Sequence, residues 1–184
     1  MNIDQKILSF DYFVTSLIKH CYNASSSEDI YDIVTDSVGK CGLSKLKLMK
    51  LLFFVTTMGI ENWYLLDNVF NNFYAMPYGP VESDIYDNLD NMPNYTITRT
   101  NLLLKTGASV TYSLDTKIID VIDKSILELQ KLNPLLFKMG AFDLVELSHS
   151  SDSWRVTFAD AQALDTLSKK MPTEVIKLSK TYYF

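Results

Sequence analysis

The chain has 184 residues, of which 47% are hydrophobic, and its 22 acidic residues outnumber its 17 basic ones, so the formal net charge is −5. This composition is typical of a folded domain with a sizeable core and excludes an intrinsically disordered chain. There is no run of about 18 uncharged apolar residues, so we expect no membrane span. Arg99 and Arg155 are the only arginines, and the absence of a dense basic patch argues against nucleic-acid binding.

The cysteines and the N-terminus exclude further classes of protein. Cys21 and Cys41 lie far apart, without CxxC spacing or nearby histidines. A structural zinc site needs about four closely spaced ligands, so we predict two free thiols, no metal and no cofactor. The first residues, "MNIDQKILSF", include an early acid and no small-residue cleavage site. They are not typical of a secretory signal, and we expect a cytoplasmic protein.

The first two predicted helices occupy the N-terminal segment, residues 1–39. Apolar residues between positions 3 and 22 recur at helical spacing, which predicts an amphipathic helix. "NASSSED" interrupts this pattern, and Ser27 is a candidate N-cap for a second helix with acids in its first turn. The glycines of "VGKCGLS" then predict the end of the second helix.

A third helix is predicted to lie at the centre of the core. Ser44 is positioned to cap "KLKLMKLLFFVTTMGI", and residues 51–55 are apolar on every side of the helix. A helix that is apolar all round must be buried. Lys47 and Lys50 lie three residues apart on one face. They either reach a solvated edge or line a groove, and we favour the solvated edge.

The stretch "MPYGPVESDIYDNL" predicts a sharp corner in the chain. After Gly59 no clean period is visible, although "NNFYAMPY" could hold a short extended piece. Gly79 precedes a proline and is therefore expected to be extended. Pro80 fits the first position of a helix, where its missing N–H costs nothing. Glu82 and Asp84 would then lie in the first turn, where acids are favoured.

The second half of the chain adds the β structure and more helices. "YTITRTNLLLKTGASVTYSL" predicts two or three short antiparallel strands, with a turn at "KTGAS". Asp115 or Thr116 caps a strong helix, "AFDLVELSHS" forms a shorter one, and residues 156–184 form a helical extension. We therefore predict an α+β fold: a single, predominantly α-helical domain over residues 1–184, around a buried central helix, with a small antiparallel sheet.

The segment "ELSHSSDSW" contains serine, histidine and aspartate, which invites a hydrolase interpretation. No G-x-S-x-G elbow is present, and a triad is assembled from separate elements. We interpret His149 as a residue at a helix C-terminus that hydrogen-bonds the last carbonyls, with a partner-binding surface as the alternative. Trp154 is an anchor or a stacking platform. No phosphate-binding glycine motif is present, so we predict no enzyme and keep a hydrolase using His149 as an alternative.

Three pieces of the chain, in this order, resemble the Panacea domain family, which includes SocA-like antitoxins and phage-associated proteins. In that family a K-L-x-K-L-L-[FY] helix precedes a Y-G-P-V corner, and an L-S-H-x-x-x-x-W element follows. The three pieces here are "LSKLKLMKLLFFV", "YGPVESDIYDNL" and "LVELSHSSDSW". The resemblance covers residues 40–155 and leaves residues 1–39 and 156–184 outside. The matching residues are Lys47, Lys50, Leu51, Leu52, Phe53, Tyr78, Gly79, Pro80, Val81, Leu147, Ser148, His149 and Trp154.

The resemblance implies an antitoxin that neutralises a cognate toxin by direct binding in a toxin–antitoxin system. Its alternative is a proteolytic adaptor that delivers the toxin to an unfoldase or protease. An acidic protein would suit a basic toxin. The expected partner-binding residues, which could equally hold the fold together, are Lys47, Lys50, Tyr78, Gly79, Pro80, His149 and Trp154. In this scheme Tyr78 and Trp154 form one aromatic-rimmed surface with the two lysines at its edge.

The C-terminal "KTYYF" is too apolar to extend freely into water. It is expected to fold back on the core, to pack across a homodimer, or to dock on a partner. The sequence leaves these three alternatives open.

Overall fold

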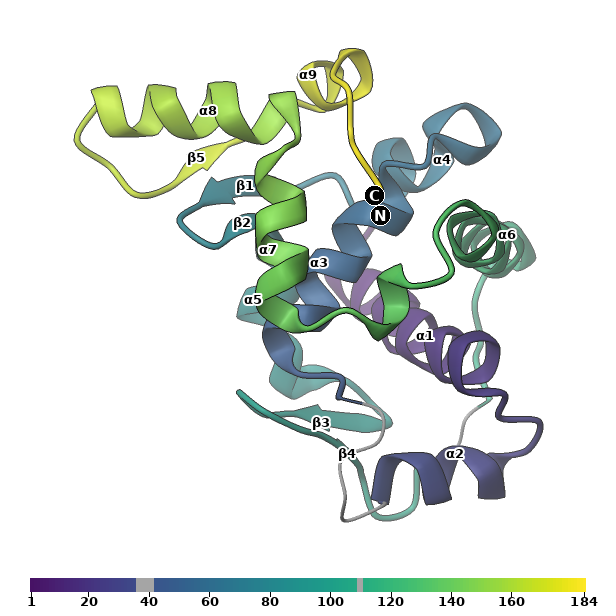
Figure 1. Ribbon diagram of the computed structural model, residues 1–184. Helices are drawn as coiled ribbons and strands as arrows, with labels where there is room; N and C mark the ends of the chain where they lie inside the picture. The colour runs from purple at the N-terminus through teal and green to yellow at the C-terminus, as the bar shows by residue number, and fades with distance from the viewer. Residues whose placement is uncertain (36–41, 109–110) are drawn as a thin grey trace.

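The computed structural model describes residues 1–35, 42–108 and 111–184 (Figure 1). The fold is α+β and predominantly helical, and within the described residues no helix is long and apolar enough to cross a membrane. Cys21 is a free thiol, whereas Cys41 lies outside the described residues. The helices are α1 (Ile3–Tyr22), α2 (Ser27–Thr35), α3 (Lys45–Thr56), α4 (Ile60–Asn68), α5 (Ser83–Asp87), α6 (Thr116–Leu132), α7 (Ala141–His149), α8 (Asp152–Ala163) and α9 (Thr173–Leu178). The strands are β1 (Phe73–Met76), β2 (Gly79–Glu82), β3 (Tyr95–Ile97), β4 (Leu102–Leu104) and β5 (Lys169–Lys170), and short 3₁₀ turns lie at Leu89–Asn91 and Leu136–Lys138.

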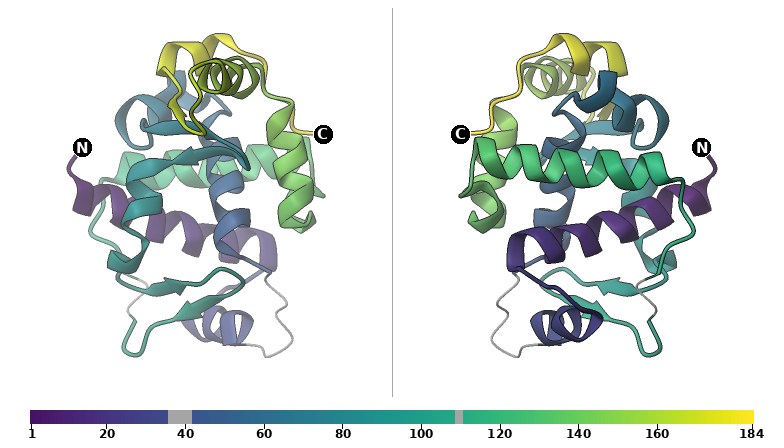
Figure 2. Two further views of the ribbon diagram at one scale, coloured as in Figure 1. Left: turned by 90° about the vertical axis from the view of Figure 1, so that its left-hand side faces the viewer. Right: turned by 90° about the vertical axis from the view of Figure 1, so that its right-hand side faces the viewer.

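The third helix, α3, is the buried centre of the fold, as predicted. The side chain of Ser44 caps it by accepting a hydrogen bond from the backbone N–H of Lys47. Helices α4, α6 and α7 and strand β2 all contact α3, and α1 lies alongside α6 (Figure 2). The solvated-edge prediction for Lys47 and Lys50 was wrong. Both are buried, because neighbouring elements cover the face of α3 that carries them.

The N-terminal cap of α2 differs from the prediction by one residue. The side chain of Ser26, which directly precedes the helix, accepts a hydrogen bond from the backbone N–H of Asp29. The Asp29 carboxylate in turn accepts from the backbone N–H groups of Ser25 and Ser26. These reciprocal bonds form a capping box, so Ser26 caps α2, and Ser27 is the first residue of the helix. The predicted glycine stop falls partly outside the described residues.

The predicted corner is a β-hairpin, so the placement of Pro80 at the start of a helix was wrong. Strand β1 pairs antiparallel with β2, with Met76 opposite Gly79, and this leaves only Pro77 and Tyr78 in the loop. Pro80 lies within β2, an edge strand of the three-stranded sheet β2-β1-β5, where a missing N–H is tolerated. Helix α5 begins three residues later, and the Glu82 carboxylate caps it by accepting from the backbone N–H of Ile85.

The second sheet is a two-stranded hairpin of β3 and β4, in which Tyr95 pairs with Leu104. The two strands therefore pair within "YTITRTNLLL", and no strand follows the predicted turn at "KTGAS" among the described residues, which leave out residues 109–110. Residues 111–114 are not a strand. Instead the Tyr112 hydroxyl donates a hydrogen bond to the buried Asp11 carboxylate of α1. Tyr112 also forms a hydrogen bond with the Thr15 hydroxyl. Hydrogen bonds to α1, rather than pairing with a strand, therefore hold this segment in place.

The region after α3, where no period was visible, contains an unusual backbone turn. Gly59, Glu61, Asn62 and Trp63 all have positive φ angles, so α4 starts with a left-handed turn. Side chains on such a turn do not follow the 3.6-residue period of a right-handed helix. This explains why apolar spacing gave no signal there.

The C-terminal extension packs on the same core as the rest of the chain. Met171 and Ile176 are buried, and β5 pairs with β1. The Tyr183 hydroxyl donates to the backbone oxygen of Thr57 at 2.7 Å, and its ring packs against Phe54. Of the three alternatives for "KTYYF", Tyr183 therefore adopts the first, folding back on the core, while Phe184 remains exposed.

Candidate functional site

The three sequence motifs meet at the β1–β2 hairpin. Lys50 of α3 donates a hydrogen bond from Nζ to the backbone oxygen of Pro80, at 2.6 Å. Gly79 has a φ of +87°, and a Cβ at this position would lie 2.3 Å from Ser148 Oγ and 3.0 Å from Lys50 Nζ. Glycine is therefore strongly favoured, because a Cβ would overlap Ser148 Oγ, press on Lys50 Nζ and strain the backbone. We call Lys50, Gly79, Ser148, His149 and Trp154 the motif cluster.

The histidine and tryptophan of the third motif hold the hairpin from α7 and α8. The His149 ring stacks on the Trp154 ring, with centroids 3.9 Å apart, and Trp154 stacks in turn on Phe158. Trp154 Nε1 donates to the backbone oxygen of Met76, at 3.0 Å. The His149 ring donates a hydrogen bond to the backbone carbonyl of Pro77, in the hairpin loop, and among the described residues it makes none to the last carbonyls of its own helix. The element therefore anchors the N-terminal side of the loop that carries Tyr78, while Lys50 of α3 holds the other side at Pro80.

Burial sets the electrostatics of the motif cluster. The Lys50 side chain is completely buried, and this lowers its pKa from 10.5 to about 7. Burial also lowers the pKa of His149; the charge of Glu146 opposes this shift and that of Lys50 adds to it. His149 Nε2 is buried and has no hydrogen-bond partner within the described part of the chain. The cluster is therefore an internal anchor in which burial disfavours the charged forms of both Lys50 and His149.

The expected aromatic rim of Tyr78 and Trp154 does not form. Trp154 is buried, whereas Tyr78 is 61% exposed and packs edge-on against Phe142 of α7, with ring centroids 6.5 Å apart. Lys47 is also away from this surface: it lies near Cys21 of α1, where its charge partly opposes the burial that raises the pKa of the thiol to about 12. Of the expected partner-binding residues, only Tyr78 is well exposed. Lys47, Lys50, Gly79, Pro80 and Trp154 are buried, and His149 is half-buried.

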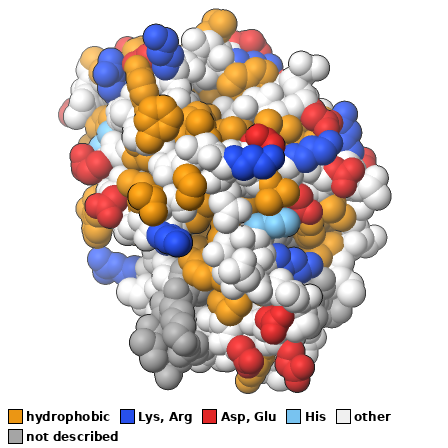
Figure 3. All heavy atoms as spheres, turned by 45° about the vertical axis from the view of Figure 1, so that its right-hand side comes forward, with side chains coloured by type: hydrophobic (Ala, Val, Ile, Leu, Met, Phe, Trp, Pro, Cys, Tyr) orange, Lys and Arg blue, Asp and Glu red, His pale blue; other side chains and the backbone are white. Residues whose placement is uncertain are grey.

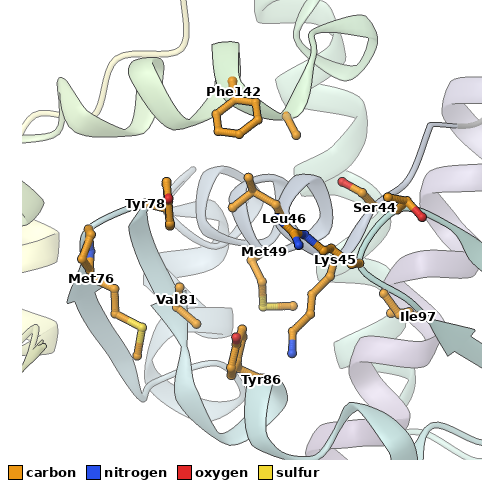
Figure 4. Close-up of a pocket in the computed structure, with 14 residues that line it drawn as sticks. Ser44, Lys45, Leu46, Met49, Met76, Tyr78, Val81, Tyr86, Ile97 and Phe142 are labelled. Carbon is orange, nitrogen blue, oxygen red and sulfur yellow. The ribbon is translucent and has the colours of Figure 1, made fainter. Parts of the chain in front are cut away.

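A groove of about 930 Å³ lies beside the hairpin, bounded by Tyr78 and Phe142. In Figure 4, Phe142 lies on one side and Tyr86 of α5 on the other, with Leu46 and Met49 of α3 between them. The Lys45 side chain extends toward Tyr86, and its ammonium lies 3.5 Å from the ring centroid. Arg99, after β3, also lines the groove. We use "the groove" for the surface formed by Lys45, Leu46, Met49, Tyr78, Tyr86, Arg99 and Phe142.

Sequence reasoning identified Tyr78 but missed the rest of the groove. Phe142 carried a usable signal: Leu144, Val145 and Ser148 face the core from α7, so a phenylalanine off that face must be exposed. Lys45 and Arg99 carried none, because each is a single basic residue within an otherwise ordinary element. No group of three or more histidine, cysteine or carboxylate side chains in the described ranges could hold a metal ion.

Comparison with known families gives one match. The family model described as "Antitoxin SocA-like, Panacea domain" matches residues 48–155, more than half of the chain. The matched span starts within α3 and ends one residue after Trp154, so it contains all five residues of the motif cluster. No curated protein and no solved structure matches the chain.

Proposed function

The chain belongs to the antitoxin SocA-like Panacea domain family, and from this premise we propose that it neutralises a cognate toxin by binding the toxin protein directly. A cytoplasmic location is part of the proposal. The observation that supports a binding role most strongly is the exposed pair of Tyr78 and Phe142 at the groove. Their exposed fractions are 61% and 68%. Large aromatic side chains at the edge of an apolar groove are typical of protein–protein contact sites.

The motif cluster supports the same role by fixing the hairpin. Lys50, Ser148 and Trp154 hold the strands and loop from three helices. The loop itself contains two residues, and Tyr78 is one of them. A rigid loop loses little conformational entropy when a partner binds, which favours affinity.

The charge of the protein suits a binding partner that is basic. The net charge is −5, and on the face seen in Figure 3 charges of both signs are interspersed among hydrophobic side chains. Electrostatic attraction between oppositely charged proteins accelerates their association and weakens with salt. A toxin that acts on nucleic acid would commonly carry such a basic surface.

The direct test is co-expression with the protein encoded by the neighbouring gene, followed by pull-down and a growth assay. We expect a stable complex and restored growth. Tyr78→Ala and Phe142→Ala should weaken the complex, whereas Tyr31→Ala, which removes a tyrosine of α2 that is 54% exposed, should not. Absence of both a complex and growth rescue would mean that family membership reports only the fold.

A second candidate function is that of a proteolytic adaptor, and the C-terminal extension offers a specific observation in its favour. Leu164, Leu167 and Leu178 are all at least 65% exposed and lie outside the family match. An adaptor needs a second surface for an unfoldase. Deleting residues 170–184 would not test this surface cleanly, because the deletion also removes the buried Met171 and Ile176.

Substitution of the three leucines by serine leaves the core intact and is the better experiment. If the chain is an adaptor, the triple variant should still bind the toxin but should no longer accelerate its turnover in cells. A matched control replaces the exposed Leu132 and Leu135 of the α6 region. Unchanged toxin turnover in the triple variant would remove the extension as an adaptor surface.

A further inference from the structure

The groove combines an apolar floor with basic side chains. Leu46 and Met49 of α3 form its floor, and Tyr78, Tyr86 and Phe142 form its sides. Its charged lining residues are Lys45 and Arg99, and no carboxylate is among the lining residues. In the whole chain acidic residues outnumber basic ones by 22 to 17. The groove is therefore a locally cationic site on an acidic protein.

Both cations are available to a partner. Neither Lys45 nor Arg99 forms an ion pair with any residue in the described parts of the chain. The ammonium of Lys45 lies over the face of Tyr86, an attraction that holds the charge at the groove without neutralising it. Arg99 is exposed, and its guanidinium can bind a carboxylate through two parallel hydrogen bonds.

We propose that the groove binds a segment of the toxin that carries a large apolar side chain with a carboxylate close to it. This inference rests on the proposed function and adds the chemistry of the contact. The apolar side chain would fill the space between Tyr78, Phe142 and Met49, and the carboxylate would pair with Lys45 and Arg99. Two cations are too few for the backbone of a nucleic acid, which needs an extended basic surface.

The net charge of −5 and the local charge of the groove have opposite signs, so they act on a partner in different ways. The acidic surface as a whole attracts a basic partner from a distance. The groove, by contrast, favours an acidic residue at the point of contact. A basic toxin would therefore bind through one of its acidic segments, and reversing the groove charges should weaken the complex rather than strengthen it.

The test is a charge reversal in the full-length chain, measured as affinity for the protein encoded by the neighbouring gene. The double variant Lys45→Glu and Arg99→Glu should lose at least about tenfold in affinity. The matched control is Lys131→Glu with Arg155→Glu, which makes the same charge change at exposed positions on α6 and α8. The control should change affinity less than about threefold. Thermal unfolding of each variant shows whether it is folded.

Crosslinking locates the segment that occupies the groove. A photo-crosslinking phenylalanine analogue at Tyr78 should capture the toxin, and the same analogue at Tyr31 should not. Mass spectrometry of the crosslinked peptide should find an aspartate or glutamate within a few residues of a large apolar residue. Reversing that toxin charge to lysine should restore binding to the double variant, since the pair would then have opposite charges again.

The outcomes distinguish this inference from the proposed function. If the wild-type chain binds the toxin and rescues growth but the double variant binds equally well or more tightly, the inference is wrong and the proposed function stands. If the wild-type chain neither binds nor rescues, both are wrong. If the wild-type chain is a dimer in light scattering and the double variant a monomer with unchanged toxin affinity, the groove holds a second copy, which also overturns the inference.

Discussion

The motif cluster and the groove lie side by side, yet they differ in almost every physical property. The cluster is buried except for the half-buried His149, and Lys50 and Trp154 each donate a hydrogen bond to a backbone carbonyl of the hairpin. The groove is open, mostly apolar, and carries two cations without carboxylate partners in the described residues. The residues that identify the family are thus those that build the hairpin. Apart from Tyr78, which belongs to the Y-G-P-V motif, the surface available to a partner consists of neighbours outside the family motifs.

This difference explains how one family framework could serve partners of different chemistry. The hairpin is fixed by contacts that lie inside the protein, and these do not depend on what binds outside. Groove positions such as Phe142 and Arg99 are exposed, so their substitution changes the binding surface at little cost in stability. The comparison therefore makes a general prediction: substitutions in the motif cluster should act on stability, and substitutions in the groove should act on binding.

The largest effect on stability is expected from Gly79→Ala. The new Cβ would lie 2.3 Å from Ser148 Oγ, and the φ of +87° is unfavourable for alanine. Overlap and backbone strain together should lower the free energy of unfolding by about 3 kcal/mol or more. The measurement is urea unfolding followed by circular dichroism.

Gly107→Ala is the matched control for Gly79→Ala. Gly107 has a similar φ of +77°, but nothing lies within 4 Å of its Cβ position. It therefore reports backbone strain alone, which we expect to cost about 1 kcal/mol. Equal losses in the two variants would show that contact with Ser148 does not matter, and the role of Gly79 in joining the motifs would have to be abandoned.

The next effect is a pH dependence caused by Lys50. Its pKa is lowered from 10.5 to about 7 in the folded protein, so between these values the unfolded chain binds the proton more tightly. The free energy of unfolding contributed by Lys50 should therefore rise with pH, by up to about 1.4 kcal/mol per pH unit. Below about pH 7 the lysine is charged in both states and the full cost of burying the charge remains.

Lys50→Met removes this titration. The difference in unfolding free energy between wild type and the variant should rise from pH 7 to pH 9. The same comparison with Lys131→Met, at an exposed lysine of α6, should stay flat. Parallel curves for wild type and Lys50→Met would mean that Lys50 keeps an ordinary pKa and is not isolated from water.

The sequence predicted parts of the buried framework correctly but did not predict the groove. The buried α3 was predictable because a helix that is apolar on every side has only one stable environment. The nearby Lys50 was misjudged because burial of a lysine depends on a backbone carbonyl from β2, thirty residues away in the chain. Pro80 was misplaced because its backbone geometry fits both the start of a helix and an edge strand, and only pairing with β1 decides between them. The groove as a whole could not be predicted, because its residues come from five separate parts of the chain that only the folded structure brings together.

A smaller effect is expected from Trp154→Phe. The phenylalanine ring can still stack on His149, but the hydrogen bond from Nε1 to the Met76 carbonyl is lost. Loss of this hydrogen bond should cost about 1 kcal/mol in unfolding free energy. The affinity for the toxin should decrease only slightly, because Trp154 affects binding only indirectly, by keeping the hairpin rigid. A variant that loses all binding while keeping wild-type stability would place Trp154 at the interface instead.

The smallest effect on stability is expected from Phe142→Ser, in the groove. Phe142 is 68% exposed and its only ring partner among the described residues is Tyr78, which is itself exposed. Most of its surface is already in water, so its loss should change the free energy of unfolding by less than about 0.5 kcal/mol. The same substitution should weaken toxin binding, because the aromatic side chain can be fully buried only by a partner. Comparison of this variant with Trp154→Phe in both assays separates framework from interface, since the two substitutions should rank in opposite order for stability and for binding.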